Sequence, residues 1–343
     1  MSLSEDIGFV AYRLPNEIDH HVCNIHSITK RTESTDISDY DFVVAPFDKF
    51  NRDTYLLKFS KVITNENIPE VQLSNGIFDD ITKENYLTDC QKLIHKLSID
   101  HLSKVVLSRT HSIKASNIST DEIFKNMMSS YPKAFIYLFH HPQIGTWAAA
   151  TPELLLSSEN STVKTVALAG TRKYDSLSSD SWGSKEIAEH KYIETFINER
   201  LDKVGLPYSK TKTFTQRAGN VEHIKSIYDI QLGENDFIHL ADLLHPGPAI
   251  SGYPIDDAMD IIKEIEAHDR QYYCGYLGPL KHKGNHYLYV NLRCMEIFDN
   301  GYKMYIGGGI TSDSKAEDEW IETKLKSGTL SAMVMSTHYE NHQ

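Results

Sequence analysis

The chain has 343 residues, of which 40% are hydrophobic and 24% charged, and its formal net charge is −12. This composition is typical of a globular protein with a large apolar core, and it argues against extensive disorder. The acidic balance argues against nucleic acid as a partner, because nucleic-acid-binding surfaces are normally basic. An anionic substrate would have to be met by a local positive site or a metal.

The first half of the chain reads as strands interrupted by two helices. Residues 1–80 alternate short apolar runs with polar turns, which predicts strands joined by loops. Helical spacing of apolar residues predicts a helix over 84–97, and the capping-box pattern Ser119-x-x-Glu122 predicts a second helix over 119–131. The runs that follow read as strands of a meandering sheet: AFIYLFHH, GTWAAA, ELLLSS and TVKTVALAG.

The second half contains further helices and then returns to strands. The strand runs are VEHIKSIYDIQL, YYCGYLGPL, HYLYVNLRCMEIF and YKMYIGGGI. Helical periodicity is found in four segments: 184–204, 236–244, 256–268 and 315–335. Blocks of strands separated by blocks of helices, without regular βαβ alternation, indicate an α+β fold with antiparallel-rich sheets flanked by helices. We expect one large domain.

The chain shows no sign of export or of membrane insertion. Its first residues contain no basic segment followed by a long apolar one, and no apolar run is long enough to span a bilayer. We therefore expect a cytoplasmic protein with no membrane contact. The cysteines form no CxxC pair and are expected to be reduced thiols in the core: Cys23, Cys90, Cys274 and Cys294.

Two of the predicted helices carry acidic residues at helical spacing. Glu186 and Glu189 lie in the helix over 184–204, and Glu319 and Glu322 lie three apart in the terminal helix. Their faces also carry lysines four residues away, so one interpretation is a solvated face with surface ion pairs. The other is that the two sets of carboxylates face each other and hold a hard cation such as Mg²⁺, which prefers oxygen ligands.

The run YIGGGIT places Gly307–Gly309 after a strand and before a helix. These glycines form either a tight turn or a backbone that approaches an anion closely. The run does not match GxGxxG and does not lie in a βαβ unit, so a dinucleotide site is excluded. The segment LAGTR has a similar character.

Single charges interrupt several apolar, strand-like runs. Lys104 and Arg293 either face solvent or line a cleft, since burying an unpaired charge is costly. In a cleft, Arg293 suits bidentate recognition of a carboxylate, and a desolvated Lys104 can serve as a base. Glu153, at the head of an apolar strand, would be a proton donor if buried. His223 is either a packing residue or a catalytic one.

Several motifs resemble, in order and spacing, those of the chorismate-utilising enzymes: KVVLSR, TPELLL, LAGTR, SKEIAEHKYI, VEHIKS, HPGPAISGYP, VNLRC, YIGGGI and DEWIETKLKSGTL. The resemblance implies a single α+β domain of two stacked antiparallel-type sheets flanked by helices, with a deep active-site cleft that requires Mg²⁺. It covers the catalytic region, residues 84–335. Residues 1–80 match only loosely and are expected to form a strand-rich part of the same domain.

The resemblance implies a role for each group of site residues. Glu189 and Glu322 would ligate Mg²⁺ directly, with Glu186 and Glu319 nearby through water, and the metal would hold the ring carboxylate of chorismate. The residues expected to bind chorismate itself are Gly170, Thr171, His223, Ala249, Arg293, Gly307, Gly308, Gly309 and Lys326. Among them, Arg293 would bind chiefly the carboxylate of the enolpyruvyl arm.

The resemblance also implies the reaction. In the isochorismate branch of the family, a lysine matching Lys104 is the base that deprotonates water for attack at ring C2. A glutamic acid matching Glu153 protonates the departing C4 hydroxyl. The aminating branch has glutamine in place of the lysine, so Lys104 speaks against an obligatory glutaminase subunit, and the complete residue set speaks against a catalytically inactive binding protein.

Ala249 separates two further branches, because salicylate synthases tend to carry threonine there. The resemblance thus implies an isochorismate synthase, an isomerase acting on chorismate. Salicylate synthase, which goes on to eliminate pyruvate, is the alternative. Whether the product serves menaquinone or siderophore synthesis stays open.

Overall fold

The computed structural model describes residues 8–99, 102–159, 162–174, 181–218, 221–232 and 237–339. The helices within these ranges are α1 (Lys83–Ile99), α2 (Thr120–Ser130), α3 (Ser184–Lys203), α4 (Phe237–Leu244), α5 (Ile255–Ile265), α6 (Ala316–Tyr339) and the short 3₁₀ helix η1 (Ile37–Asp39). The first nine strands are β1 (Phe9–Arg13), β2 (His21–Lys30), β3 (Phe42–Ala45), β4 (Tyr55–Thr64), β5 (Lys104–Lys114), β6 (Phe135–His141), β7 (Gly145–Thr151), β8 (Leu154–Glu159) and β9 (Thr162–Lys173). The others are β10 (Tyr208–Lys210), β11 (Phe214–Ala218), β12 (Val221–Gln231), β13 (Gly252–Tyr253), β14 (Tyr276–Pro279), β15 (His286–Val290), β16 (Cys294–Phe298) and β17 (Gly301–Ile310).

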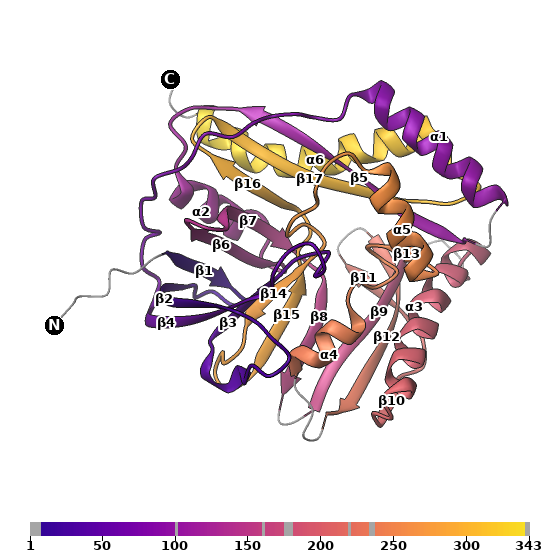
Figure 1. Cartoon of the computed structure of the whole chain (residues 1–343), viewed down its shortest axis with the longest axis horizontal. Coiled ribbons are helices and arrows are strands. Elements are labelled where there is room, and N and C mark those ends of the chain that lie inside the picture. Colours follow the sequence, from indigo (N-terminus) through magenta and orange to yellow (C-terminus); the bar gives the residue numbers. More distant parts are fainter. Residues whose placement is uncertain are drawn as a thin grey trace.

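Hydrogen bonds link the described strands into one 17-stranded network. Figure 1 shows its two parts: β16, β17 and β5 cross the upper part beside α6 and α1, whereas β8, β9 and β12 descend at the lower right beside α3. The strand pairs are antiparallel, and helices flank the sheet. The predicted fold class, α+β with antiparallel-rich sheets, is therefore confirmed.

Strand β6 shows why several strands read as continuous apolar runs. Its residues Phe135, Tyr137 and Phe139 point into the larger of two hydrophobic clusters, and Ile136 and Leu138 point into the smaller one. Because neighbouring side chains on a strand point to opposite faces, a strand with both faces buried has no polar alternation. Helices α2 and α6 cover the smaller cluster.

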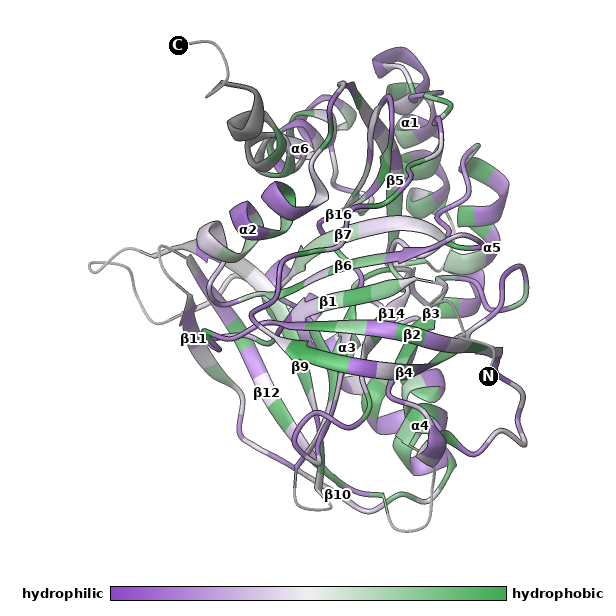
Figure 2. Cartoon of the chain, turned by 90° about the vertical axis from the view of Figure 1, so that its left-hand side faces the viewer, coloured by the Kyte–Doolittle hydropathy of each residue, from purple (hydrophilic) through white to green (hydrophobic). Residues whose placement is uncertain are grey.

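The N-terminal strands belong to the same sheet as the rest. Strand β1 pairs with β6, placing Phe9 opposite His140, and β3 pairs with β14, placing Ala45 opposite Tyr276. Figure 2 shows β7, β6, β1, β2 and β4 side by side. Truncating the first strands would therefore remove hydrogen-bond partners from the middle of the network.

Most of the helices and strands predicted from the sequence are present, although their first and last residues differ from the prediction. The helix predicted over 119–131 is α2, and its N-cap Ser119 accepts a hydrogen bond from the Glu122 amide, as the capping box predicts. The four cysteines are buried and free, as predicted. Within the described residues, no helix is both long and apolar enough to cross a membrane.

Three predictions about elements are wrong. HYLYVNLRCMEIF is two strands, because β15 pairs with β8 and β14 whereas β16 pairs with β7 and β17, and Arg293 between them has a φ of 50°. In YYCGYLGPL the strand is confined to β14, since the backbone turns at Gln271 and Cys274, where φ is positive. The helix predicted to reach residue 268 ends at Ile265, because Glu266 is extended.

Candidate active site

A cavity of about 400 Å³ is lined by residues of β5, β17, α3 and α6. Most of the predicted site residues line it: Lys104, Gly170, Glu186, Glu189, Ala249, Gly307, Gly308, Gly309, Glu319, Glu322 and Lys326. They come from segments far apart in the sequence. The fold therefore gathers most of the predicted metal-binding and substrate-binding residues around one space.

The floor of the cavity is the glycine run, which lies inside strand β17. Gly307–Gly309 pair with Ser108–Val106 of β5, so the tight turn considered from sequence is absent. A Cβ added at Gly309 would lie 2.4 Å from Cε of Lys104, and one at Gly308 would lie 3.4 Å from Oε2 of Glu319. The missing side chains thus leave room for the lysine and the carboxylate above the strand.

Lys104 is the first residue of β5 and extends over Gly309. Its ammonium Nζ lies 3.7 Å from Oε1 of Glu189, and its side chain is 18% exposed. Gly252 and Tyr253 of β13 pair with this end of β5 and fix its backbone. The lysine therefore faces the cavity from a rigid strand instead of facing bulk solvent, which was the alternative left open from sequence.

The acidic residues of α3 and α6 line the same cavity. Glu319 accepts a hydrogen bond from the Ser314 hydroxyl at 2.6 Å, and Lys326 contacts Glu322 at 2.7 Å and donates to the carbonyl of Gly307. Burial, with a further contribution from the charge of Glu322, raises the pKa of Glu319. Crowded carboxylate oxygens from two helices are a donor set that fits a hard dication such as Mg²⁺.

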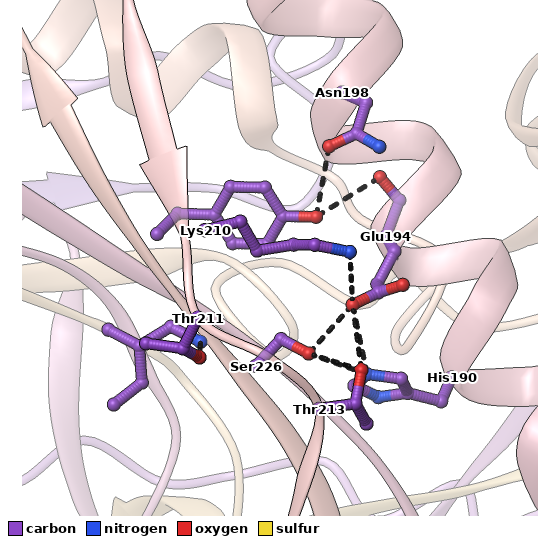
Figure 3. Close-up of polar contacts among 9 residues, drawn as sticks. His190, Glu194, Asn198, Lys210, Thr211, Thr213 and Ser226 are labelled. Atoms are coloured by element: carbon purple, nitrogen blue, oxygen red, sulfur yellow. Dashed lines mark hydrogen bonds and ion pairs between the residues drawn. The ribbon is translucent and has the colours of Figure 1, made fainter.

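A polar cluster anchors α3 on the neighbouring strands (Figure 3). Glu194 accepts hydrogen bonds from Lys210 at 2.8 Å and from the Ser226 hydroxyl at 2.7 Å. His190 Nε2 lies 3.0 Å from the same hydroxyl. Since Glu186 and Glu189 precede these residues on α3, the cluster fixes the rotation of the helix that points both carboxylates at the cavity.

Glu153 lies between β7 and β8 and is not among the residues that line the cavity. Its backbone carbonyl accepts from the amide of Val290 at 2.9 Å, and its side chain is partly buried. Burial raises the pKa of the Glu153 carboxyl, against the opposing charges of Lys104 and Arg293. The charge of Glu153 also adds to the effect of burial that raises the pKa of the cavity-lining Cys274 to about 12.

The remaining predicted residues lie around the cavity without lining it. Arg293 is exposed in the link between β15 and β16. His223 Nδ1 lies 3.2 Å from the carbonyl oxygen of Gly170, and its partner in the strand pair is Thr171. The side chain of Thr171 lies outside the described residues. The structure therefore places His223 within hydrogen-bonding distance of the cavity-lining Gly170, and Arg293 next in the chain to the cavity-lining Leu292.

Six lining residues were not singled out as site residues from the sequence: Val106, Lys185, Ile250, Tyr273, Cys274 and Leu292. Lys185 adds positive charge opposite α6, and its spacing from Glu189 was the only signal that it shares that helical face. Tyr273 and Cys274 were hidden in a segment predicted to be a strand. A Cβ at Gly307 would lie 2.8 Å from the Tyr273 hydroxyl, so this ring closes one end of the floor.

A buried ion pair supports the cavity from behind. Arg270 donates to both carboxylate oxygens of Glu266, at 2.6 and 2.8 Å, and each side chain is 3% exposed. Arg270 also donates to the carbonyls of Ile250 and Val106, two residues that line the cavity. Glu266 in turn accepts from the amide of Ser108. The pair thus joins the end of α5 to β5 and to the loop that carries Ala249.

The fold and the cavity define a class of enzyme with an acidic, glycine-floored pocket between two helices, and comparison with known proteins identifies it. The chain matches the chorismate binding enzyme family over residues 11–332 and belongs to that family. The family suspected from the sequence motifs is thereby confirmed.

Individual relatives differ in their named activity. Isochorismate synthase EntC of Escherichia coli strain K12 is 29% identical over 245 residues, which are 67% of this chain and 61% of that protein. Anthranilate synthase component 1 of Aquifex aeolicus is 26% identical over 264 residues, 73% of this chain and 52% of the relative. The chain thus spans less than two thirds of the length of these relatives.

A solved structure shares the fold over nearly the whole chain. It is that of MenF, the menaquinone-specific isochorismate synthase from Escherichia coli, at a TM-score of 0.79 and 18% identity, covering 97% of this chain and 90% of that one. The similarity extends to the N-terminal strands that the sequence motifs did not reach.

Proposed function

We propose that the chain is an isochorismate synthase that converts chorismate to isochorismate by adding water at ring C2 and releasing the C4 hydroxyl. The observation that carries the proposal is Lys104, which lines the cavity beside Glu189 and above Gly309. A lysine in this place offers a base for water, whereas the resemblance described above implies glutamine at this position in the aminating branch of the family. The isochorismate synthase EntC of Escherichia coli is the relative that lends further support.

Glu186, Glu189, Glu319 and Glu322 would hold Mg²⁺. When bound, the ion supplies positive charge that neutralises the substrate carboxylate and these side chains. The chain adds its own positive groups, since Lys185 and Lys326 line the same cavity. This local arrangement would allow an acidic protein to bind an anionic substrate.

The proton transfers would be made by Lys104 and Glu153. Lys104 takes a proton from the water that forms the new bond to C2, and Glu153 gives a proton to the departing C4 oxygen. The raised pKa of Glu153, caused by its burial, favours the protonated form that this role requires. Because water is the nucleophile, the reaction needs no glutaminase subunit.

Product identification tests the proposal directly. We expect the chain, incubated with chorismate and Mg²⁺, to form isochorismate without releasing pyruvate, and to lose this activity when a chelator removes the metal. Chromatography of the products, with a coupled assay for pyruvate, is the measurement. Release of pyruvate with salicylate would establish the lyase alternative, and an aminated product formed only with ammonia would overturn the proposal.

A glycine substitution tests whether Lys104 must lie above β17. In Gly309→Ala, the new methyl group would occupy the place of the Lys104 side chain, 2.4 Å from Cε. A displacement of a catalytic group by an ångström lowers kcat by about 100-fold, and we expect a loss of that order. The matched control is Gly328→Ala, because a Cβ at Gly328 meets nothing within 4 Å. Equal kcat in the two variants would show that the lysine position is unimportant.

A further inference from the structure

We propose that Glu17, His21 and His282 bind one transition-metal dication of the Zn²⁺ type, at a site separate from the active-site cavity. One ligand atom from each residue lies within 4.8 Å of the others. None of the three lines the cavity.

The three residues come from two turns of the sheet. Glu17 lies between β1 and β2, His21 is the first residue of β2, and His282 lies between β14 and β15. These strands lie in the lower left and centre of Figure 1, away from α3 and α6. The ring centroids of the two histidines are 5.0 Å apart and the ring planes are inclined at 69°, so the rings are in edge-to-face contact.

The hydrogen bonds of both histidines leave their Nε2 atoms for a ligand. His282 Nδ1 lies 3.1 Å from the Tyr12 hydroxyl, and His21 Nδ1 lies 3.4 Å from the Thr64 hydroxyl. With Nδ1–H donated to these oxygens, each Nε2 carries a lone pair, the arrangement that outer partners impose on metal-binding histidines. Without a metal, His282 can instead donate from Nε2 to Glu17, which is 3.3 Å away.

Two of the candidate ligand atoms have no other role. Within the described residues, His21 Nε2 and Glu17 Oε2 are buried without a hydrogen-bond partner. Buried polar atoms are normally paired, so each such atom requires an explanation. A cation between them would satisfy both at once.

Charge around the site is compatible with a cation. Lys283 contacts Oε1 of Glu17 at 2.7 Å, but its side chain is 68% exposed, and the inner oxygen Oε2 is left for the metal. Two imidazole nitrogens and one carboxylate, with water as a fourth ligand, form a donor set typical of Zn²⁺, whereas Mg²⁺ prefers oxygen alone. The chain would therefore hold two kinds of metal in two places, and the Zn²⁺-type site would clamp the β1–β2 turn to the β14–β15 turn.

The test uses Co²⁺ as a coloured substitute for Zn²⁺. We expect the full, tag-free chain, with Mg²⁺ in excess to fill the carboxylate cavity, to bind one equivalent of Co²⁺ with the intense visible band of tetrahedral coordination, and Zn²⁺ to abolish the band. His21→Ala and Glu17→Gln should each remove it. The control is His26→Ala, an exposed histidine on the same strand, which should keep it.

A second measurement does not depend on the colour. Zn²⁺ should raise the unfolding temperature of the wild type and of His26→Ala but not that of His21→Ala, with circular dichroism showing that each variant is folded. Absence of the band in the wild type, or its persistence in His21→Ala and Glu17→Gln, would overturn the proposal. Chorismate is absent from both measurements, so their result is independent of the proposed activity.

Discussion

Lys104→Ala is expected to lower kcat for isochorismate formation by about 10²–10⁴-fold, the usual contribution of a positioned acid or base. The lysine lines the cavity, lies 3.7 Å from Glu189 and is held by a strand paired on both sides. Alanine removes the proposed base but leaves the glycine floor and the carboxylates. The KM for chorismate should therefore change little, and steady-state kinetics with added Mg²⁺ would separate the two parameters.

The matched control is Lys114→Ala, at the exposed far end of the same strand. It removes an equal charge from β5 and should leave kcat unchanged. Lys104→Gln provides a second comparison, because the family resemblance implies glutamine in the aminating branch, and this side chain should not restore the reaction with water. Unchanged kcat in Lys104→Ala would remove Lys104 from the mechanism and, with it, the main reason for choosing water as nucleophile.

Glu266→Gln is expected to lower the free energy of unfolding by about 3–5 kcal/mol, the usual cost of leaving a buried charge unpaired. Arg270 would keep its charge at a site where the side chain is 3% exposed. Denaturant unfolding followed by circular dichroism measures the change. The control is Glu264→Gln, which breaks an exposed pair with Lys96 and should cost less than about 1 kcal/mol.

The same pair predicts how stability depends on pH. Burial alone would raise the pKa of Glu266, but the charge and hydrogen bonds of Arg270 outweigh it and lower the pKa. A carboxyl whose pKa is lower in the folded protein than in the unfolded chain adds to the free energy of unfolding. This contribution is fully present above the pKa of the unfolded chain, about 4.3, and is lost as the pH falls through the pKa of the folded protein. Acidification below pH 4 should therefore lower the free energy of unfolding of the wild type more than that of Glu266→Gln. At pH 7, a loss of less than 1 kcal/mol in Glu266→Gln would show that Arg270 finds another partner.

The sequence was informative where local periodicity decides the structure. Helices α1 and α2 were located from apolar spacing and from the Ser119 cap, and periodicity placed Glu319 and Glu322 on one face of the terminal helix. These features depend on residues three or four positions apart. That α3 and α6 line one cavity depended on the family resemblance, because no local pattern relates residues more than a hundred positions apart.

Residue spacing could not predict features that depend on burial in the folded chain. Glu266 and Arg270 are four apart, as are Glu322 and Lys326, yet the first pair is 3% exposed and the second 48–51% exposed. Nothing in the spacing separates a surface ion pair from one in the core. Glu17 and His282 are 265 positions apart, so only the pairing of distant strands brings them together. The sequence also did not decide whether Arg293 faces solvent or a cleft. Its left-handed backbone conformation arises because the strands before and after it pair with different neighbours.

The two acidic helices are held by different parts of the molecule. Helix α3 packs on β9 and β12, whereas α6 packs on β17, α1 and α2, and their carboxylates reach a common cavity. If a dication and a carboxylate substrate bind together in this cavity, each would stabilise the spacing between the two helices that the other requires. If magnesium binds there as proposed, thermodynamic reciprocity requires that magnesium change the affinity for chorismate by the same factor as chorismate changes the affinity for magnesium.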